Sequence, residues 1–280
     1  MSVAGSANRS MATDIFFKES QIPRPVIIYT HGFNGFKDWG NFDMIAQAYV
    51  EAGYVFVKYN LSHNGTTVEF PDRFVDLEAY GNNNYSKECN DALLLCDFIQ
   101  GSDFPAKQYS NPNSIILLGH SRGGAISILT AIANPSVRAL LLWASTASCT
   151  TPWRHWPPEQ LHLWKQRGVA HYENKRTKQH LPLYYQLYED YQQHQQKFHI
   201  PTHFSNLQIP IHLTHGIDDQ AVPLTDALYL HSLNSHATIH TLHTDHVFGR
   251  IHSPTVRSIP QATQLAIAAD LQFLSLHSIV

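Results

Sequence analysis

The chain has 280 residues, of which 43% are hydrophobic and 15% are charged, and its formal net charge is −3. This length and composition suffice for one large globular domain, or for a domain with a small insertion. The nearly neutral charge argues against nucleic acid or an anionic membrane as the partner.

The cysteines and histidines give no metal-binding pattern. Three of the 19 histidines are regularly spaced, but they fall on a predicted strand and the loop after it, where no further ligand completes a tetrahedral set. These three are His240, His243 and His246. The cysteines lack ligand spacing, and we expect buried, reduced thiols: Cys89, Cys96 and Cys149. We therefore expect neither a metal nor a cofactor.

Long apolar stretches are also missing. No run of about 18 apolar residues occurs, so no membrane-spanning helix is predicted. Residues 1–20 lack the continuous apolar stretch of a secretory signal. A cytoplasmic location is the default expectation, with a small molecule as the partner.

Strands and helices alternate along the chain, which predicts a mostly parallel sheet covered by helices on both faces. Short apolar runs predict strands at residues 25–30, 54–59, 115–118, 139–144, 209–214 and 238–242. Helical spacing of apolar residues predicts helices at residues 39–52, 86–100, 123–133, 224–233 and 261–276. We expect Ser86 to cap the second of these helices. The predicted fold class is α/β, a doubly wound and mostly parallel sheet.

One connection is far longer than a crossover requires. Residues 145–208 separate two predicted strands, whereas a single crossover helix needs only about 10–12 residues. Many aromatic residues argue against a disordered linker. We therefore expect a core domain at residues 1–145 and 207–280, with a helical cap inserted at residues 146–206. Its aromatic side chains are candidates for substrate binding, or else for the cap's own small core; the candidates are Trp153, Trp156, Trp164, Tyr184 and Tyr188.

The most informative motif follows the strand at residues 115–118. Gly119-His120-Ser121-Arg122-Gly123 is a G-x-S-x-G sequence between a predicted strand and a predicted helix, which is the context that this motif requires. The glycines permit a tight turn, because a Cβ at either position would clash with the neighbouring strand or helix. We expect the turn to raise the Ser121 hydroxyl above the sheet edge as the nucleophile of a serine hydrolase.

A nucleophilic serine needs a base, and the base needs an acid to orient it. Asp219 lies just past a predicted strand whose carboxyl end shares the sheet edge with Ser121, and Asp218 is the alternative. His246 follows the last predicted strand and completes the chain order Ser, Asp, His, with His243 as its rival. The sequence thus predicts a triad of Ser121, Asp219 and His246.

Two backbone amides are candidates for an oxyanion hole. His31-Gly32-Phe33 follows the first predicted strand, and its glycine permits a turn that aims the Phe33 amide inward. The Arg122 amide, directly after the serine, would be the second donor; losing one such donor costs on the order of 3 kcal/mol. The Arg122 side chain is expected to pair with a nearby acid or to bind a substrate carboxylate.

With these motifs, the chain resembles the α/β-hydrolase superfamily over nearly its whole length. The resemblance is carried by His31-Gly32-Phe33, the Gly119–Gly124 segment, Asp219 between His-Gly and Val-Pro, and His246. Within the superfamily, the chain resembles the dienelactone-hydrolase-like and acyl-ester esterase branch, including cinnamoyl-type members. The resemblance implies the α/β-hydrolase fold and hydrolysis of a small or medium carboxylic ester through an acyl-enzyme.

Two alternatives remain open from the sequence. The same triad serves peptide or amide hydrolysis and acyl transfer, and no motif separates these reactions from ester hydrolysis. A ligand receptor or pseudoenzyme that keeps the pocket with little turnover is the alternative outside the enzymes.

Overall fold

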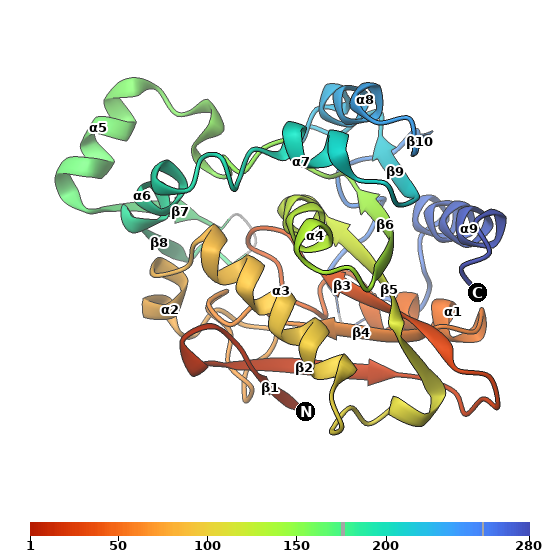
Figure 1. Ribbon diagram of the computed structural model, residues 1–280. Helices are drawn as coiled ribbons and strands as arrows, with labels where there is room; N and C mark the ends of the chain where they lie inside the picture. The colour runs from red at the N-terminus through yellow and green to blue at the C-terminus, as the bar shows by residue number, and fades with distance from the viewer. Residues whose placement is uncertain (175–176, 254) are drawn as a thin grey trace.

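A mostly parallel sheet runs through the centre of the molecule. The structure is a computed structural model that describes residues 1–174, 177–253 and 255–280. Within these residues, eight strands form one sheet in the order β1-β2-β4-β3-β5-β6-β9-β10 (Figure 1). Their bounds are β1 Ser2–Ala4, β2 Ser10–Phe16, β3 Arg24–Thr30, β4 Val55–Tyr59, β5 Ser110–His120, β6 Val137–Trp143, β9 Ile211–Gly216 and β10 Ala237–Leu242. The pairings from β4 to β10 are parallel, which confirms the predicted sheet.

The first two strands were not predicted. β2 pairs antiparallel with β4, with Thr13 opposite Tyr59, and β1 pairs antiparallel with β2. The β2 sequence, Ser-Met-Ala-Thr-Asp-Ile-Phe, lacks the continuous apolar run of the central strands. Its pairing with β4 supplies the hydrogen bonds that define it as a strand, and this pairing joins residues far apart in the sequence.

Helices cover both faces of the sheet. Their bounds are α1 Phe42–Glu51, α2 Leu77–Gly81, α3 Tyr85–Gln100, α4 Arg122–Ala133, α8 Leu224–Leu233 and α9 Gln261–Leu276, with short 3₁₀ helices at Ser6–Asn8 and Lys107–Tyr109. Alternate residues of each central strand enter opposite cores: Ile27 packs with α1 and α9, while Ile28 packs with α3 and α4. The doubly wound α/β class is therefore confirmed. Among the described helices, none combines the length and apolar character needed to cross a bilayer.

The predicted cap of α3 is wrong by two residues. The helix begins at Tyr85, and the Asn84 side chain accepts a hydrogen bond from the Lys87 amide, 3.0 Å away. The Ser86 hydroxyl and amide instead donate to Asp190. Asn84 is the N-cap because its carboxamide oxygen reaches the amide three residues on, which otherwise has no partner within the helix.

The inserted segment (residues 146–206) contains strands as well as helices. It consists of a 3₁₀ helix at Trp153–His155, α5 Pro158–Arg167, β7 Val169–Glu173, β8 His180–Tyr184, α6 Gln186–Gln193 and α7 Ile200–Asn206. β7 and β8 pair antiparallel as a separate sheet, which the expectation of a helical cap did not include. In Figure 1, α5, α6, β7 and β8 lie together at one end of the molecule, far from β10 and α9.

Candidate active site

Ser121 lies in a strained turn between β5 and α4. Its φ of 58° and ψ of −123° are rarely adopted by residues other than glycine, and such strain is typical of functional sites. Backbone hydrogen bonds stabilise the turn: the Ser121 amide donates to Trp143 O at 2.9 Å, and the Gly124 amide donates to Ser121 O at 3.0 Å. The turn is the one that the G-x-S-x-G sequence predicts.

The two glycines of the motif are required by backbone packing. A Cβ on Gly119 would lie 2.5 Å from Gly123 O, and a Cβ on Gly123 would lie 2.2 Å from Thr30 O. Both distances are well inside van der Waals contact, and both obstacles are backbone atoms. The clash with the helix and the neighbouring strand, expected from the sequence, is confirmed.

An aspartate–histidine pair lies on the same edge of the sheet. His246 Nδ1 is 2.7 Å from Asp219 Oδ2, and Asp219 Oδ1 accepts hydrogen bonds from the amides of Ala221 and Val222. Burial raises the pKa of the Asp219 carboxyl, but hydrogen bonds from His215 and His246 outweigh it and hold this pKa well below its ordinary value. A carboxylate only accepts hydrogen bonds, so Nδ1 of His246 carries the proton and Nε2 is left as an acceptor.

The alternatives are placed differently. Asp218 is exposed, and its backbone amide donates to Thr244 O at 3.1 Å. His243 is exposed as well. The structure thus pairs Asp219 with His246 and leaves both alternative residues at the surface.

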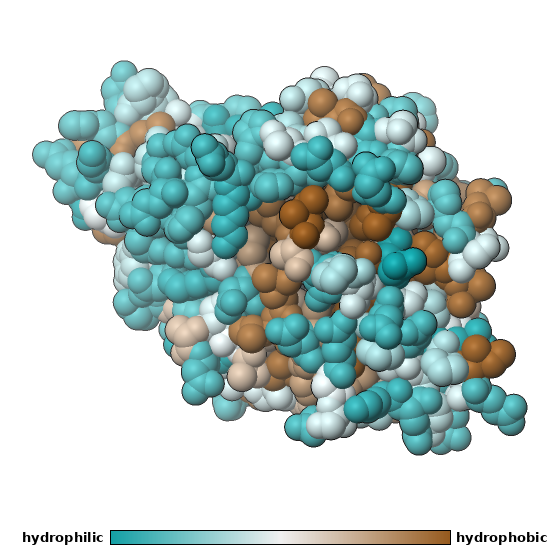
Figure 2. Space-filling view, viewed as in Figure 1, coloured by the Kyte–Doolittle hydropathy of each residue, from teal (hydrophilic) through white to brown (hydrophobic). Residues whose placement is uncertain are grey.

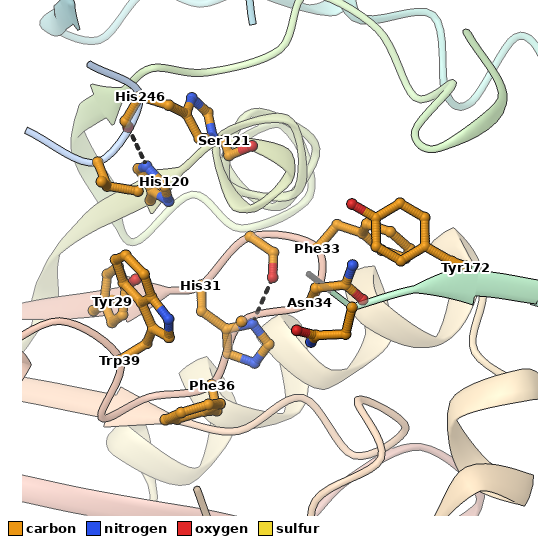
Figure 3. Close-up of a pocket in the computed structure, with 14 residues that line it drawn as sticks. Tyr29, His31, Phe33, Asn34, Phe36, Trp39, His120, Ser121, Tyr172 and His246 are labelled. Atoms are coloured by element: carbon orange, nitrogen blue, oxygen red, sulfur yellow. Dashed lines mark hydrogen bonds between the residues drawn. The ribbon is translucent and has the colours of Figure 1, made fainter. Parts of the chain in front are cut away.

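Ser121 and His246 face one cavity. Figure 3 shows the His246 ring beside the Ser121 side chain at the top of this pocket. Among the described residues, no hydrogen bond joins the Ser121 hydroxyl to the ring, and this bond often tightens only when substrate binds. The arrangement has the parts that deprotonation of a serine requires: a hydroxyl, a ring nitrogen with a lone pair, and a carboxylate behind the ring.

His120, directly before the serine, positions the loop that carries His246. Its Nε2 donates to the His246 carbonyl oxygen at 2.9 Å, and the two rings are 4.8 Å apart. Burial lowers the pKa of His120 well below its ordinary value, so the ring is neutral. The sequence did not indicate this role for His120, because the G-x-S-x-G motif leaves its second position unspecified.

Arg250 also supports this loop, and the sequence did not indicate it. The side chain is buried, and its Nε donates to Val247 O at 2.8 Å. The guanidinium carbon lies 4.8 Å from the Phe42 ring centroid and 5.7 Å from that of Trp143. Phe248 is buried against the same tryptophan at 5.4 Å. The loop after β10 is therefore held from inside the core, which fixes where His246 lies.

The loop after β3 passes directly against the serine. A Cβ on Gly32 would lie 2.9 Å from Ser121 Cβ, so only glycine allows this approach. His31 holds the loop: its Nδ1 donates to Gly32 O at 2.9 Å, and its Nε2 accepts from the Leu61 amide at 3.2 Å. Burial lowers the pKa of His31 to about 4, which keeps the ring neutral for both bonds. The Phe33 amide thereby follows the closest point of approach to Ser121.

The Arg122 amide and side chain point to different surroundings. The amide is the first of α4, where helical amides have no partner within the helix and attract negative charge. The buried side chain donates from Nε to Glu88 at 2.7 Å and lies 3.9 Å from the Tyr85 ring centroid. Of the two expected roles for this side chain, the structure shows pairing with an acid.

The pocket in front of Ser121 has a volume of about 260 Å³ and mainly aromatic walls (Figure 3). No aspartate, glutamate, lysine or arginine occurs among the fourteen described residues that line it. Its polar side chains include two carboxamides, those of Asn34 and Asn174. The aromatic walls come from Tyr29, Phe33, Phe36, Trp39 and Tyr172.

The five aromatic residues proposed for substrate binding are not among those fourteen. Trp164 is 6.0 Å from Trp153, 5.1 Å from Trp156 and 6.1 Å from Tyr188 between ring centroids, so these four build the interior of the inserted segment. The hydroxyl of the fifth, Tyr184, donates to Glu78. The surface around α5 is mostly hydrophilic in Figure 2.

The inserted segment reaches the pocket through other residues. Tyr172, on β7, packs its ring edge-on against Phe33 at 5.4 Å, and Asn174 follows the same strand. Neither residue was predicted to line the pocket, because no strand was predicted in this segment. In the sequence, a strand at Val-Ala-His-Tyr-Glu could have been indicated only by an alternation of side chains between two faces.

A cluster of carboxylates lies elsewhere on the molecule. Oxygens of Asp14, Asp38 and Asp43 lie within 4.8 Å of one another. The buried Lys58 ammonium pairs with all three, and Lys37 pairs with Asp14 and Asp38, so two cations offset part of the negative charge.

Comparison with known proteins supports the fold. In each of three solved structures the α/β architecture extends over the whole chain. Est1E from Butyrivibrio proteoclasticus, bound to ferulic acid, has 14% identity and a TM-score of 0.71, covering 99% of this chain and 98% of that one. Mouse alpha/beta hydrolase domain-containing protein 10 has 17% identity and a TM-score of 0.68, with 99% and 98% covered. The alpha/beta hydrolase GrgF from Penicillium sp. sh18 has 16% identity and a TM-score of 0.70, with 99% and 97% covered. The fold is therefore that of the α/β-hydrolases.

The family follows from the sequence itself. The model of the Esterase family, described as "Putative esterase", matches residues 6–232. The chain belongs to this family, and the match supports an ester-hydrolysing α/β-hydrolase. No curated protein matches the chain significantly.

Proposed function

We propose that the protein is a serine hydrolase that cleaves a small or medium carboxylic ester through an acyl-enzyme. The observation that carries the proposal is the 2.7 Å contact between Asp219 and His246, whose ring lies beside the strained Ser121 in an aromatic-walled pocket. Membership of the Esterase family supports the same reaction class.

The reaction begins at the serine hydroxyl. His246 Nε2 takes the Ser121 proton, and Oγ attacks the ester carbonyl carbon. The amides of Phe33 and Arg122 bind the oxyanion that forms. His246 then donates its proton to the alkoxide, and the alcohol leaves. Asp219 keeps the ring in the tautomer that accepts at Nε2 and stabilises the imidazolium between the two transfers.

Water completes the cycle. His246 takes a proton from a water molecule, which attacks the acyl carbon, and the tetrahedral intermediate collapses to release the carboxylic acid and return the proton to Ser121 Oγ. The inserted segment acts as the predicted cap in this proposal, because Tyr172 and Asn174 bring it to the pocket wall. The aromatic walls, and the ferulic acid in the Est1E structure, make esters of aromatic acids the first substrates to test.

Replacing the nucleophile tests the proposal. We expect Ser121→Ala to lower kcat for aryl esters by on the order of 10⁴-fold or more, with an unchanged thermal unfolding curve. A fluorophosphonate probe should label the original chain and not this variant. Ser102→Ala, at an exposed serine, is the matched control and should keep both properties.

Two results would contradict the mechanism. Undiminished turnover in Ser121→Ala would exclude this serine as the nucleophile, and absence of labelling in the original chain would favour a receptor or pseudoenzyme. Aminoacyl anilides assayed beside the aryl esters separate ester from amide hydrolysis, and an added alcohol acceptor reports acyl transfer.

A further inference from the structure

Asn34 lies in the pocket directly after the proposed oxyanion donor Phe33. Its φ is 57°, in the left-handed region that asparagine tolerates better than most residues. The side chain lines the cavity in front of Ser121 (Figure 3). A left-handed asparagine here is explained by the turn alone, so a role in binding must rest on the carboxamide.

Tyr80 orients that carboxamide. The Tyr80 hydroxyl donates a hydrogen bond to Asn34 Oδ1. The tyrosine is buried, and burial raises the pKa of its hydroxyl well above the ordinary value, so it stays protonated and able to donate. Its ring is held by Phe74 at 5.8 Å and by Phe33 at 6.2 Å. Asn34 Oδ1 is thus directed at Tyr80, and this hydrogen bond does not use the Nδ2 group.

The Nδ2 group of Asn34 donates no hydrogen bond within the described residues. When a ligand fills the pocket, this donor loses its water. The loss reduces the binding free energy by about 1–3 kcal/mol unless the ligand supplies an acceptor. The pocket therefore discriminates between ligands that carry an acceptor at this point and those that do not. An unpaired buried donor discriminates between two substrates more strongly than the gain or loss of one methylene against an apolar wall does.

The charge of the pocket limits what the acceptor is. No lysine or arginine lines the cavity among the described residues, and the nearby Arg122 guanidinium is paired with Glu88. A carboxylate entering this pocket would lose water without gaining a cationic partner. A neutral oxygen loses less hydration free energy, and the Asn34 Nδ2 group supplies a hydrogen-bond donor for it.

We propose that Asn34 is a specificity-determining residue, and that its Nδ2 donates a hydrogen bond to an uncharged ether, hydroxyl or keto oxygen of the ester substrate, apart from the ester group itself. The inference rests on the proposed function and narrows its substrate class to neutral, oxygen-bearing esters. Tyr80 is a positioning residue that acts through Asn34.

A pair of isosteric esters tests this inference. 4-Nitrophenyl methoxyacetate and 4-nitrophenyl butyrate differ by one ether oxygen in place of a methylene, and 2-methoxyethyl and butyl esters of one acid form the matching pair on the alcohol side. The measured quantity is kcat/KM for the ether-containing ester divided by kcat/KM for its alkyl counterpart. The intrinsic reactivity of each ester then cancels when variants are compared. We expect Asn34→Asp to lower the ratio for one pair by about 10-fold, because the donor becomes a charged acceptor.

Two further variants separate binding from backbone geometry. Asn34→Gly keeps the left-handed turn and removes the carboxamide, and we expect it to lower the same ratio by a similar factor. Tyr80→Phe removes only the hydroxyl that orients Asn34, and we expect a smaller fall of about 3-fold, consistent with one neutral hydrogen bond. Circular dichroism and thermal unfolding verify the fold of each variant.

The outcomes are distinct. A ratio that falls in Asn34→Asp and Asn34→Gly, and less in Tyr80→Phe, supports the inference. Ratios within about 2-fold of the original chain in both pairs overturn it, even when the variants are slower on every ester, since a merely structural asparagine affects both members of a pair equally. Absence of ester turnover in the original chain overturns the proposed function and this inference together.

Discussion

The turn around Ser121 and the inserted segment are built by different kinds of contact. At the turn, backbone packs against backbone: a Cβ on Gly119 or Gly123 would meet a neighbouring backbone atom at less than 3 Å. In the inserted segment, large aromatic side chains pack against one another, and Gly168 has no heavy atom within 4 Å of its Cβ position. Backbone packing fixes atoms that must react and tolerates no added atom, whereas side-chain packing permits substitution and allows the pocket wall to vary.

The largest difference in activity is expected between alanine substitutions at two glycines, Gly123 in the turn and Gly168 in the inserted segment. In Gly123→Ala, the new Cβ would meet Thr30 O at 2.2 Å and His31 O at 2.6 Å, and relief requires moving the loop that carries the Phe33 amide. We expect kcat/KM for aryl esters to fall by about 10²–10³-fold, the usual cost of losing one oxyanion donor or misplacing it by 1 Å.

Gly168→Ala is the matched control, with a φ of 71° but open space around the Cβ. Because alanine is disfavoured in the left-handed conformation, we expect the free energy of unfolding to fall by about 1–2 kcal/mol. We expect kcat/KM to stay close to the original value. Steady-state kinetics and thermal unfolding measure both effects. Equal losses of activity in the two variants would erase the distinction between the regions.

The second contrast concerns the aromatic interior of the inserted segment. Trp164 is 1% exposed, and its Nε1 donates to Leu183 O at 2.6 Å. We expect Trp164→Ala to destabilise this segment by about 3–5 kcal/mol through the cavity it leaves. Because Tyr172 lies on the adjoining hairpin, KM should rise while kcat for a small acetate ester changes little.

Hydrogen exchange across residues 158–193 detects the loosening, and Trp164→Phe should show a weaker version of it. A fall in kcat on the acetate ester as large as that of Gly123→Ala would show that the inserted segment also fixes the reacting groups.

Acid should weaken the region around the serine before the aromatic interior. Burial lowers the pKa of His31 to about 4, whereas in the unfolded chain it is about 6.5. Between these two values the unfolded state binds the proton and the folded state does not, so stability falls as the pH falls. The contribution of His31 is complete above pH 6.5, and up to about 3 kcal/mol of it is lost by pH 4.

Urea unfolding at pH 7, 5.5 and 4.5 measures this loss, and His31→Gln should reduce its dependence on pH. Hydrogen exchange across residues 158–193 follows the inserted segment, whose tryptophan rings do not titrate in this range. An identical pH slope in His31→Gln would assign the loss to other buried histidines.

Much of the core follows from local sequence. Each of the six predicted strands and five predicted helices overlaps an observed one, because continuous Val, Ile and Leu runs are buried on both faces of a parallel sheet. The tight turn at Ser121 is equally local, since two glycines and the flanking elements determine it. The order of motifs along the chain also predicted Asp219 and His246 as partners. In the structure, Asp219 Oδ2 lies 2.7 Å from His246 Nδ1.

The pocket wall and the sheet edge depended instead on the tertiary structure. Thr13 becomes part of a strand only by pairing with the Tyr59 region, and Trp164 becomes an interior residue only because Trp153 and Tyr188 pack around it. Such contacts join residues far apart in sequence and leave no local pattern. The sequence alone therefore determined the α/β class and predicted Ser121, Asp219 and His246 as a triad, because local sterics and strand order govern these features. Only long-range packing decided that Tyr172 and Asn34, rather than the tryptophans of the inserted segment, line the pocket in front of Ser121.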